Sequence, residues 1–526
     1  MKKAAKWIFP LMGLLVCLGL TVCVMQLSKE IREQAVREGV ASLEEPIFSV
    51  PGGFYEDAFA LEIRVPQGCR VLYTTDGSIP EPGNPQTVTE YQSPISISGG
   101  KPVSEAIEHW RNTGERAQEQ SAAVIRAIAV NDAGEKSKVV SATYFVGEEE
   151  LAERSIVSIV MEPEDLFGEQ GIYTNYEGRG KEWEREINLE IFEEGLSLNQ
   201  PAGIRIQGAS AREMYSKRFS VFSRKEYSGS KLFDSLRGEN DDGEAVEKSL
   251  LGETPIHSFV LREGLMNAFI QHLVQDRDIA SADAKETCVF VNGRFWYCTM
   301  LQEKYSSTYF EKHYGFGKDN VILIKGNQPE TEEPGDLEKF QEIYTYLRTH
   351  DMVREDAYEG FCELVDIRSY IEFCCVNLYF GNLDFNEQKN VYYWRSREVG
   401  RSPREDGCWR WGLYDLDLEN LDYGYLETDI NTFALETHYA GGAFRDREMF
   451  ATLRENPQFC RDFVDIFLEM IRTDFQPEHV GQVWEEWNCT PEYWRKDSDW
   501  WKEYFPVRNQ KMLEFIREEF PDAEWP

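Results

Sequence analysis

The chain has 526 residues, 42% hydrophobic and 13% aromatic, which is enough apolar material for a large folded domain and a smaller companion and excludes a disordered chain. Acidic residues outnumber basic ones by 93 to 56, and the formal net charge is −37. A surface with this average charge repels phosphate backbones, so nucleic acid is not expected as a partner. A nucleotide would need local basic groups or bound cations.

The first 28 residues have the pattern of a membrane anchor. Lysines within the first six residues precede an uncharged run over residues 7–25, which at ~1.5 Å per residue just crosses a hydrocarbon core of ~30 Å. The sequence therefore predicts an anchor at 1–28, a juxtamembrane linker at 29–45, and a single-pass membrane protein with an extracytoplasmic C-terminal part. A cleaved signal peptide and lipidation at Cys23 are the alternatives.

Residues 46–147 are predicted to form a small β-sandwich. Short β-like runs are separated by turn clusters such as Asp76-Gly77-Ser78, as in antiparallel sandwiches. The strings PGGFY (51–55), LYTTDGSIP (72–80) and IRAIAV (125–130) resemble the immunoglobulin-like domain at the C-terminus of chitobiase and β-hexosaminidase. The resemblance implies an accessory spacer or binding module without chemistry of its own. A polar insertion near residues 100–120 departs from it.

Residues 148–526 are predicted to form one domain of mixed α and β structure. Alternation over residues 203–208 and 217–222 predicts an antiparallel sheet in the first part of this domain. Later in the chain, an apolar helix is expected over residues 367–380 with Asp366 as its N-cap, followed by a strand over residues 391–395.

Two of the eleven cysteines, Cys17 and Cys23, fall in the expected anchor, and the odd number that remains argues against a complete disulfide framework. Cys288 and Cys298 flank an Asn292-Gly293 turn signal, so they are placed to face each other across a hairpin. Burial as small hydrophobic residues is the alternative for most of the cysteines.

A first candidate site lies in GIRIQGASAR (203–212) and the KRFSVF string (217–222). Period-two alternation puts Lys217 on the face of Phe219 and Val221, and a buried lysine needs an anionic partner. A phosphate is one such partner, and the loop containing Ser210 and Arg212 offers backbone N–H groups to it. Alternatively, Lys217 lies at a strand edge and reaches water.

A second candidate site combines NLDFNEQKN (382–390) with the strand WRWGLYDLD (409–417). Carboxylates at Asp415 and Asp417, beside an amide-rich loop, are suitable oxygen ligands for Mg²⁺. The order of these residues also matches a kinase catalytic loop and its metal-binding strand. Asp384 comes first, Asn390 follows six residues later, and a carboxylate lies on the next arm of the hairpin. Alternatively, Asp415 and Asp417 only cap turns.

These strings, with the VNGRFWY hairpin (291–297) leading to Glu303, resemble the ordered signature blocks of the spore coat protein H (CotH) family over residues 155–425. The resemblance implies a bilobal, kinase-like CotH domain that transfers phosphate from ATP to serine or threonine of coat proteins. The implied fold class is multidomain: an N-terminal transmembrane helix, an all-β Ig-like sandwich, and an α+β bilobal domain at residues 148–526.

The resemblance also assigns roles to individual residues. Lys217 would hold the nucleotide phosphates, and Asp384 would orient and deprotonate the acceptor hydroxyl. Asn390, Asp415 and Asp417 would bind Mg²⁺, with Mn²⁺ as the alternative ion. The expected partners are therefore a nucleotide, a protein acceptor such as a coat protein, and the membrane.

Some assignments stay open. Glu303 fits either a hinge contact to the nucleotide or a structural ion pair. The chain departs from the family at 209–211, where Ala-Ser-Ala replaces Asn-Ser-Ser, and at a charged helix position near Asn267. The alternative function is a non-catalytic protein of spore-coat assembly or adhesion with a kinase-like fold. The family also suggests the spore coat or forespore surface as a location.

Overall fold

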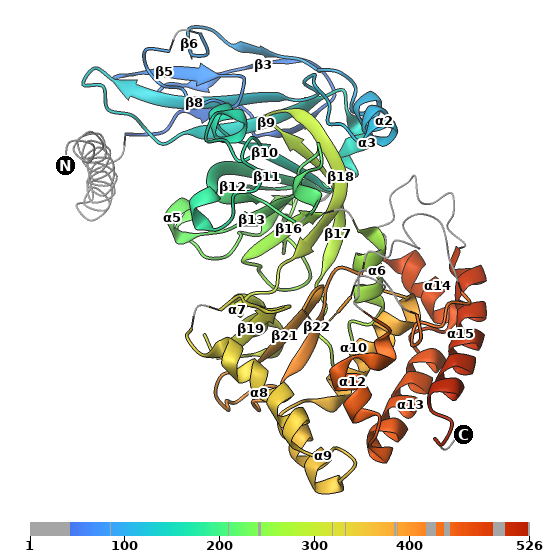
Figure 1. Cartoon of the computed structure of the whole chain (residues 1–526). Coiled ribbons are helices and arrows are strands. Elements are labelled where there is room, and N and C mark those ends of the chain that lie inside the picture. Colours follow the sequence, from blue (N-terminus) through green and yellow to red (C-terminus); the bar gives the residue numbers. More distant parts are fainter. Residues whose placement is uncertain are drawn as a thin grey trace, which may run out of the picture.

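The computed structural model describes residues 43–523 except 85, 209, 240–242, 263, 318, 332, 383–384, 387, 417–427, 436–441 and 488–499. Along the chain the described part forms a β-rich module, a curved central sheet, and a largely helical part (Figure 1). We refer to the curved central sheet and the helical part as the two lobes.

The expected fold class needs correction. Across the described ranges no helix is both long enough and apolar enough to cross a membrane, and the expected anchor at 1–28 lies outside them. The sandwich is not all-β either, because its insertion forms helix α2 (Val103–Thr113). The apolar side chains of Val103, Ala106 and Ile107 recur at helical spacing and are buried, a pattern that the surrounding charged residues obscure.

The module is built on a sheet with strand order β2-β9-β8-β5-β6 and on smaller strand pairs, β3 with β7 and β1 with β4. Leu61, Ile97, Ile125 and Tyr144 form the core between its layers. The strands are β1 (Ile47–Phe48), β2 (Gly53–Tyr55), β3 (Phe59–Leu61), β4 (Ile63–Arg64), β5 (Cys69–Thr74), β6 (Thr89–Glu90), β7 (Ile95–Ile97), β8 (Ala123–Asn131) and β9 (Val140–Val146).

The central sheet has the order β11-β10-β17-β18-β16-β13-β12-β14-β15, and β11 also pairs with β12. This extra pairing closes the sheet into a barrel whose interior is packed with side chains such as Phe219, Phe259 and Leu301. Its strands are β10 (Ile156–Val160), β11 (Arg185–Glu193), β12 (Leu196–Ile206), β13 (Phe219–Phe222), β14 (Leu236–Glu239), β15 (Ala245–Lys248), β16 (Ser258–Arg262), β17 (Ala284–Val291) and β18 (Arg294–Glu303). Short helices accompany them: α3 (Glu149–Ala152), α4 (Pro163–Phe167), η1 (Lys181–Trp183), η2 (Ser210–Arg212) and α5 (Lys225–Ser228).

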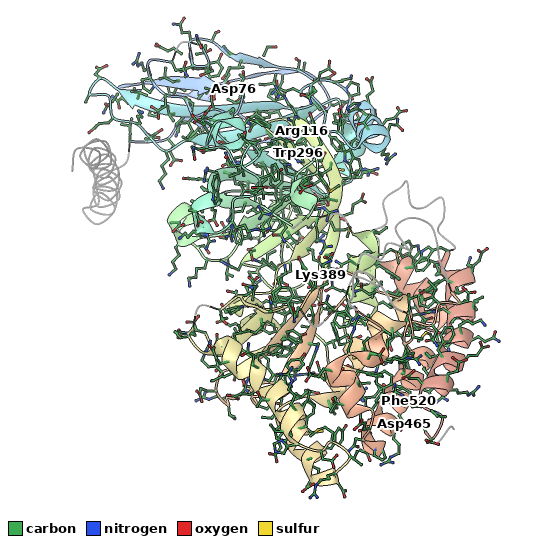
Figure 2. All side chains as sticks on the ribbon, in the orientation of Figure 1. Asp76, Arg116, Trp296, Lys389, Asp465 and Phe520 are labelled. Carbon is green, nitrogen blue, oxygen red and sulfur yellow. The ribbon has the colours of Figure 1, made fainter. Side chains whose placement is uncertain are left out.

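The module docks on the outer face of the barrel. Phe145 of the module packs edge-on against Phe290 with ring centroids 4.9 Å apart, within a buried apolar cluster that also contains α2 side chains. At one barrel end, Arg116 from the module lies 4.9 Å from the ring centre of Trp296 and also faces other aromatic rings; both residues are labelled in Figure 2. A guanidinium among aromatic rings is a favourable cation–π contact, so the module closes that end of the barrel.

The helical part surrounds a sheet with order β20-β19-β21-β22. Helix α10 (Ile367–Phe380) is buried along nearly its whole length, and the Asp366 side chain accepts a hydrogen bond from the backbone N–H of Ser369, so the expected helix and cap are confirmed. The other elements are β19 (Val321–Lys325), β20 (Gln328–Pro329), β21 (Val391–Ser396), β22 (Arg410–Leu413), α6 (Leu265–Leu273), α7 (Ser307–Tyr314), α8 (Asp336–Thr349), α9 (Glu355–Cys362), η3 (Phe444–Asp446), α12 (Glu448–Leu453), α13 (Pro457–Arg472), α14 (Pro477–Glu486) and α15 (Trp500–Glu519).

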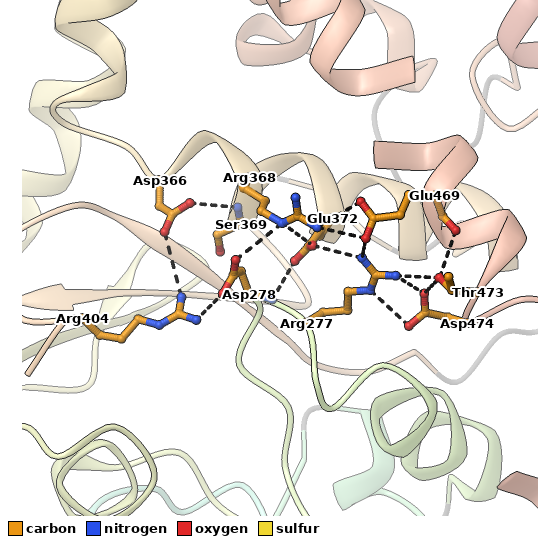
Figure 3. A network of polar contacts seen from close by, with 10 residues as sticks. All are labelled: Arg277, Asp278, Asp366, Arg368, Ser369, Glu372, Arg404, Glu469, Thr473 and Asp474. Carbon is orange, nitrogen blue, oxygen red and sulfur yellow. Dashed lines mark hydrogen bonds and ion pairs between the residues drawn. The ribbon is translucent and has the colours of Figure 1, made fainter. Parts of the chain in front are cut away.

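An ion-pair network ties the segment after α6 to α10 and α13 (Figure 3). Glu372 of α10, with its side chain 1% exposed, lies 2.9 Å from Arg368 and 3.5 Å from Arg277. Arg277 in turn contacts Glu469 of α13 at 2.7 Å. Because several charges share their partners here, the network is better placed to stabilise the fold than an isolated surface pair.

The expected pairing across the β17–β18 hairpin is present: Cys288 and Cys298 are direct cross-strand partners. Their thiols are free, their Sγ atoms lie 2.7 Å apart, and the residues are 1% and 3% exposed. We expect glutathione disulfide to oxidise the two thiols to one intramolecular disulfide bond. The two protons and two electrons that the thiols lose reduce the glutathione disulfide to two molecules of glutathione. The bond should stabilise the chain by about 2–3 kcal/mol.

Intact-mass measurement before and after oxidation, followed by non-reducing peptide mapping, checks this expectation. Adjacent Cys374 and Cys375 serve as the internal control, because they lie on helix α10 rather than on paired strands and should remain thiols. Recovery of Cys288 and Cys298 as alkylated thiols after oxidation would contradict the expected bond.

Candidate functional site

An ion pair joins the barrel to the helical part. Arg262, the last residue of β16, is 4% exposed, and its Nη2 donates to Oδ1 of Asp415 at 2.6 Å. Asp415 follows β22 with φ of 58°, the left-handed region that non-glycine residues rarely adopt. Such conformations persist where the surroundings fix them, and they cluster at functional sites.

More basic side chains face the same place from the barrel and from β19. Alternation and strand register put Arg205 and Arg262 on the outer face of the barrel, toward the helical part, and continuing the register by one residue puts Arg218 beside Arg262. Lys304 follows β18, and Lys325 ends β19. We call this set the basic cluster: Arg205, Arg218, Arg262, Lys304 and Lys325.

The charges of the basic cluster act on each other and on Asp415. Burial tends to raise the pKa of Asp415, but Arg262, together with Arg218 and Lys325, holds it below its usual value. Burial lowers the pKa of Lys304, and the positive charges of Arg205 and Lys325 lower it further. Glu330 lies 3.7 Å from Lys304, and Glu184 lies 3.5 Å from Arg205. The cations closest to Asp415, which are Arg218, Arg262 and Lys325, are therefore the part of the cluster best placed to meet a polyanion.

Amide side chains hold the backbone around Asp415. The backbone N–H of Leu416 donates to Oδ1 of Asn267 at 3.0 Å, and Nδ2 of Asn267 donates to Oε1 of Gln302 at 3.2 Å. Nδ2 of Asn382 donates to the carbonyl of Asp415 at 3.4 Å. Asn267, where the sequence departs from the family pattern, therefore positions the residue after the candidate metal ligand.

The hairpin of β21 and β22 brings Asn390 close to Asp415. Val391 pairs with Leu413, so Asn390, just before β21, lies at the same end of the hairpin as Tyr414 and Asp415. Asn390 also has a left-handed φ, 60°. Of the expected catalytic and metal-binding residues, Asp384 and Asp417 lie outside the described ranges, and their roles stay predictions.

Lys217 lies on the other face of the sheet. It is 4% exposed, and its Nζ donates to the backbone carbonyl of Arg212 and faces the rings of Tyr173 and Tyr176 at 4.9 and 4.2 Å. Burial lowers the pKa of Lys217. The structure therefore does not bring Lys217 together with Asp415. The next residue in the chain, Arg218, lies on the outer face of the barrel, which is the face toward Asp415.

The loop before Lys217 is held by Arg212. The guanidinium of Arg212 donates to the backbone carbonyls of Ile206, Gly208, Tyr176 and Gly178 at 2.5–3.0 Å. In this arrangement it positions the loop rather than facing a ligand. Ser210 belongs to η2, and its side chain lies outside the described part.

Glu303 forms an ion pair, which is one of the two roles that the sequence left open for it, the other being a hinge contact to the nucleotide. Its Oε2 lies 2.8 Å from Nε2 of His313 in α7, and the side chain is 4% exposed. Burial raises the pKa of Glu303, and the contact with His313 partly offsets this effect. Glu303 is paired across the sheet with Phe259, an interior barrel residue, so it faces away from the basic cluster.

None of the five residues of the basic cluster is among the site residues predicted from the sequence. Alternation alone could have found Arg205 and Arg218. Arg205 shares a strand face with Gln207 and Arg218 shares one with Ser220, so both arginines lie on the polar faces of their strands, opposite the apolar residues. Nothing in the local sequence places Arg262 and Lys325 beside Asp415, because Arg262 comes from the barrel and Lys325 from a different strand of the sheet that contains β22.

Comparisons with known proteins agree with the resemblance seen in the sequence. The family model described as CotH kinase protein matches residues 204–520, more than half of the chain, and the model described as Fn3 associated matches residues 61–144. No curated protein matches. A solved structure, the D00-D0 domain of Intimin, is 11% identical over 39% of this chain and 95% of its own, with a TM-score of 0.12, too low to support any argument.

Proposed function

Since the chain belongs to the CotH kinase protein family, we propose that it transfers the γ-phosphate of ATP to serine or threonine hydroxyls of surface or spore-coat proteins in a Mg²⁺-dependent reaction. The main support is Asp415, an ionised carboxylate within the basic cluster and beside Asn390. The cations can attract the negatively charged triphosphate, and Asp415 and Asn390 can offer oxygen atoms to its metal ion. Both requirements of a Mg²⁺–nucleotide complex are therefore met at one site.

The residues present fit a hard divalent cation. Arg262 occupies Oδ1 of Asp415, and the Asp415 side chain remains 35% exposed, so the carboxylate can offer an oxygen to an ion. The amide oxygen of Asn390 is of the same ligand class. Bound Mg²⁺ would neutralise phosphate charge and orient the nucleotide. Asp415 and Asn390, with Asp417, are the residues proposed to hold it.

The chain's own residues would act mainly through position and charge. The basic cluster would bind the triphosphate, with Arg218 and Arg262 on the barrel side and Lys325 on the other. Asn267 and Asn382 would keep the Asp415 carboxylate in place. Asp384 is the proposed group that orients and deprotonates the acceptor hydroxyl.

Asp415→Asn is expected to abolish measurable autophosphorylation, at least about a 100-fold loss, because the amide keeps an oxygen ligand but loses the negative charge that attracts the ion. Intact mass after incubation with ATP and Mg²⁺ or Mn²⁺ measures transfer, and thermal shift with the same ligands measures binding. Asp465→Asn, an exposed change on α13, is the matched control. A folded wild-type protein that neither binds Mg²⁺–ATP nor gains phosphate would contradict the proposal and favour the non-catalytic assembly or adhesion function.

A pair of neighbouring variants locates the phosphates within the same experiment. Arg218→Met should weaken Mg²⁺–ATP binding about 10-fold or more, because a charge-assisted contact is lost. Lys217→Met should leave the affinity of the folded protein within about twofold, because its ammonium lies inside the barrel end. The reverse ranking would restore Lys217 as the nucleotide lysine.

A further inference from the structure

A cluster of metal-ligating side chains lies away from the basic cluster, where the barrel meets α7. Asp283 directly precedes β17, Glu303 ends β18, and His313 is near the end of α7. One ligand atom from each residue lies within 4.8 Å of the others. Three separate elements thus bring a nitrogen and two carboxylate ligands together.

Local contacts fix each of the three residues. The backbone N–H of Glu303 donates to the carbonyl of Asp283 at 2.9 Å. The ring of His313 packs on Tyr309 with centroids 4.2 Å apart. The Asp283 carboxylate lies against Gly252, where an added Cβ would stand 2.4 Å from Oδ2. Ligands already held in place lose little conformational entropy on binding an ion.

Two carboxylates share a single imidazole as their counter-charge in this cluster. The carboxylates of Asp283 and Glu303 face an imidazole, and within the part of the chain that the structure describes neither pairs with a lysine or arginine. Glu303 is 5% exposed, and a buried carboxylate needs a compensating charge. A divalent cation supplies that charge at the point where these side chains converge.

An ion can reach the cluster from solvent. Asp283 lines a cavity of about 890 Å³, together with residues of the barrel edge and His272 of α6. Asp283 is the one of the three residues that lines this cavity, and the His313 side chain is 25% exposed at the surface, so the cluster is open to solvent although Glu303 is buried.

We propose that Asp283, Glu303 and His313 bind one divalent transition-metal ion, Zn²⁺ or Mn²⁺. An imidazole with two carboxylates suits these ions better than Mg²⁺, which prefers oxygen ligands alone. With three protein ligands, a fourth position would be left to water. On binding, the ion takes the place of the direct contact between His313 and Glu303.

The location gives the ion a structural role between the lobes. Glu303 and Lys304 are consecutive, and Lys304 belongs to the basic cluster, whereas Glu303 faces the proposed metal. His313 lies on α7, which packs on β19 of the helical part. The ion would therefore connect the last barrel strand to the helical part beside the proposed nucleotide site, without being part of it.

Metal binding to the full chain, stripped with a chelator and kept free of nucleotide, tests the proposal. Titration with ZnCl₂, followed by calorimetry and elemental analysis, should give one ion per chain and a higher melting temperature, and MnCl₂ should compete with Zn²⁺ for this ion's position. Asp283→Asn and His313→Gln should each weaken binding about 10-fold or more, while Asp415→Asn should leave it unchanged. Co²⁺ in place of Zn²⁺ should give an absorption spectrum that His313→Gln alters.

Glu311→Gln, an exposed change on the same helix, is the matched control and should bind like the wild type. Far-UV circular dichroism establishes that each variant is folded. Absence of stoichiometric Zn²⁺ or Mn²⁺ binding would overturn the proposal and leave a simple His–Glu ion pair. Equal binding by folded Asp283→Asn and His313→Gln would overturn it as well, because the ion would then lie elsewhere.

Discussion

Replacing Arg508 of α15 with methionine is expected to unfold the helical part under conditions where the wild type is stable. Arg508 is 1% exposed, and its guanidinium donates to the carbonyls of Leu378, Tyr379, Thr428 and Ile430 at 2.7–2.9 Å. The variant leaves these buried acceptors without their donor, and each such loss costs about 1–3 kcal/mol. The cation also lies at the C-terminal end of α10, where the helix dipole favours it. We expect a total loss of about 4 kcal/mol or more.

Chemical unfolding followed by circular dichroism measures this loss. Arg508→Lys should recover only part of the stability, because an ammonium cannot reproduce the planar fork of donors. Arg461→Met, an exposed change on α13, is the control and should alter stability by less than about 0.5 kcal/mol. An Arg508→Met midpoint equal to that of the wild type would contradict the expected role.

Arg508 also connects the end of the chain to the proposed site. Leu378 and Tyr379 lie in the last turn of α10, which leads into residues 381–390, and Thr428 and Ile430 lie just beyond 417–427. The proposed catalytic Asp384 and metal ligand Asp417 belong to these flanked segments. A partly folded Arg508→Lys protein should therefore lose nucleotide binding before it loses the barrel.

The parts of the fold that the sequence predicted are those with strong local signals. Helix α10 has an aspartate cap and an apolar run, and β21 begins directly after the turn that Asn386 and Lys389 form. Such signals depend on neighbours within a few residues. The hairpin that places Asn390 beside Asp415 follows from them, as does the cross-strand pair of Cys288 and Cys298.

The sequence pattern could not predict that the central sheet closes into a barrel. Alternation correctly put Lys217 on the buried face with Phe219, but it does not say which of two faces meets the other lobe. The face of Lys217 turned out to be the barrel interior, because β11 pairs with both β10 and β12. A backbone carbonyl and aromatic rings, rather than a phosphate, surround the ammonium there.

The same limit applies to the module. Its polar insertion contains α2, whose apolar face packs on the barrel, and Arg116, which faces Trp296 of the barrel. Amphipathic spacing was present, but the partner surface lies on strands more than a hundred residues further along the chain. Docking between module and barrel is thus a tertiary property that local pattern does not reveal.

The docked module should make stability depend on pH through Glu190 of β11. Glu190 is 1% exposed and accepts hydrogen bonds from Oγ1 of Thr143 in the module at 2.6 Å and from Nδ2 of Asn199 at 3.2 Å. Burial raises the pKa of Glu190 from 4.5 to about 8. Between these values the folded state binds more protons than the unfolded state, so stability falls as pH rises from about 4.5 to about 8.

Glu190→Gln removes the ionisable group and keeps its shape, so the variant should lack this part of the pH dependence. At one pKa unit per ~1.4 kcal/mol, it should be more stable than the wild type at pH 8 by roughly 2–4 kcal/mol and similar to it near pH 5. Chemical unfolding at several pH values measures the difference. Glu186→Gln on the exposed side of the same strand should follow the wild type throughout. Parallel curves for Glu190→Gln and the wild type would mean that Glu190 is not held neutral where module and barrel meet.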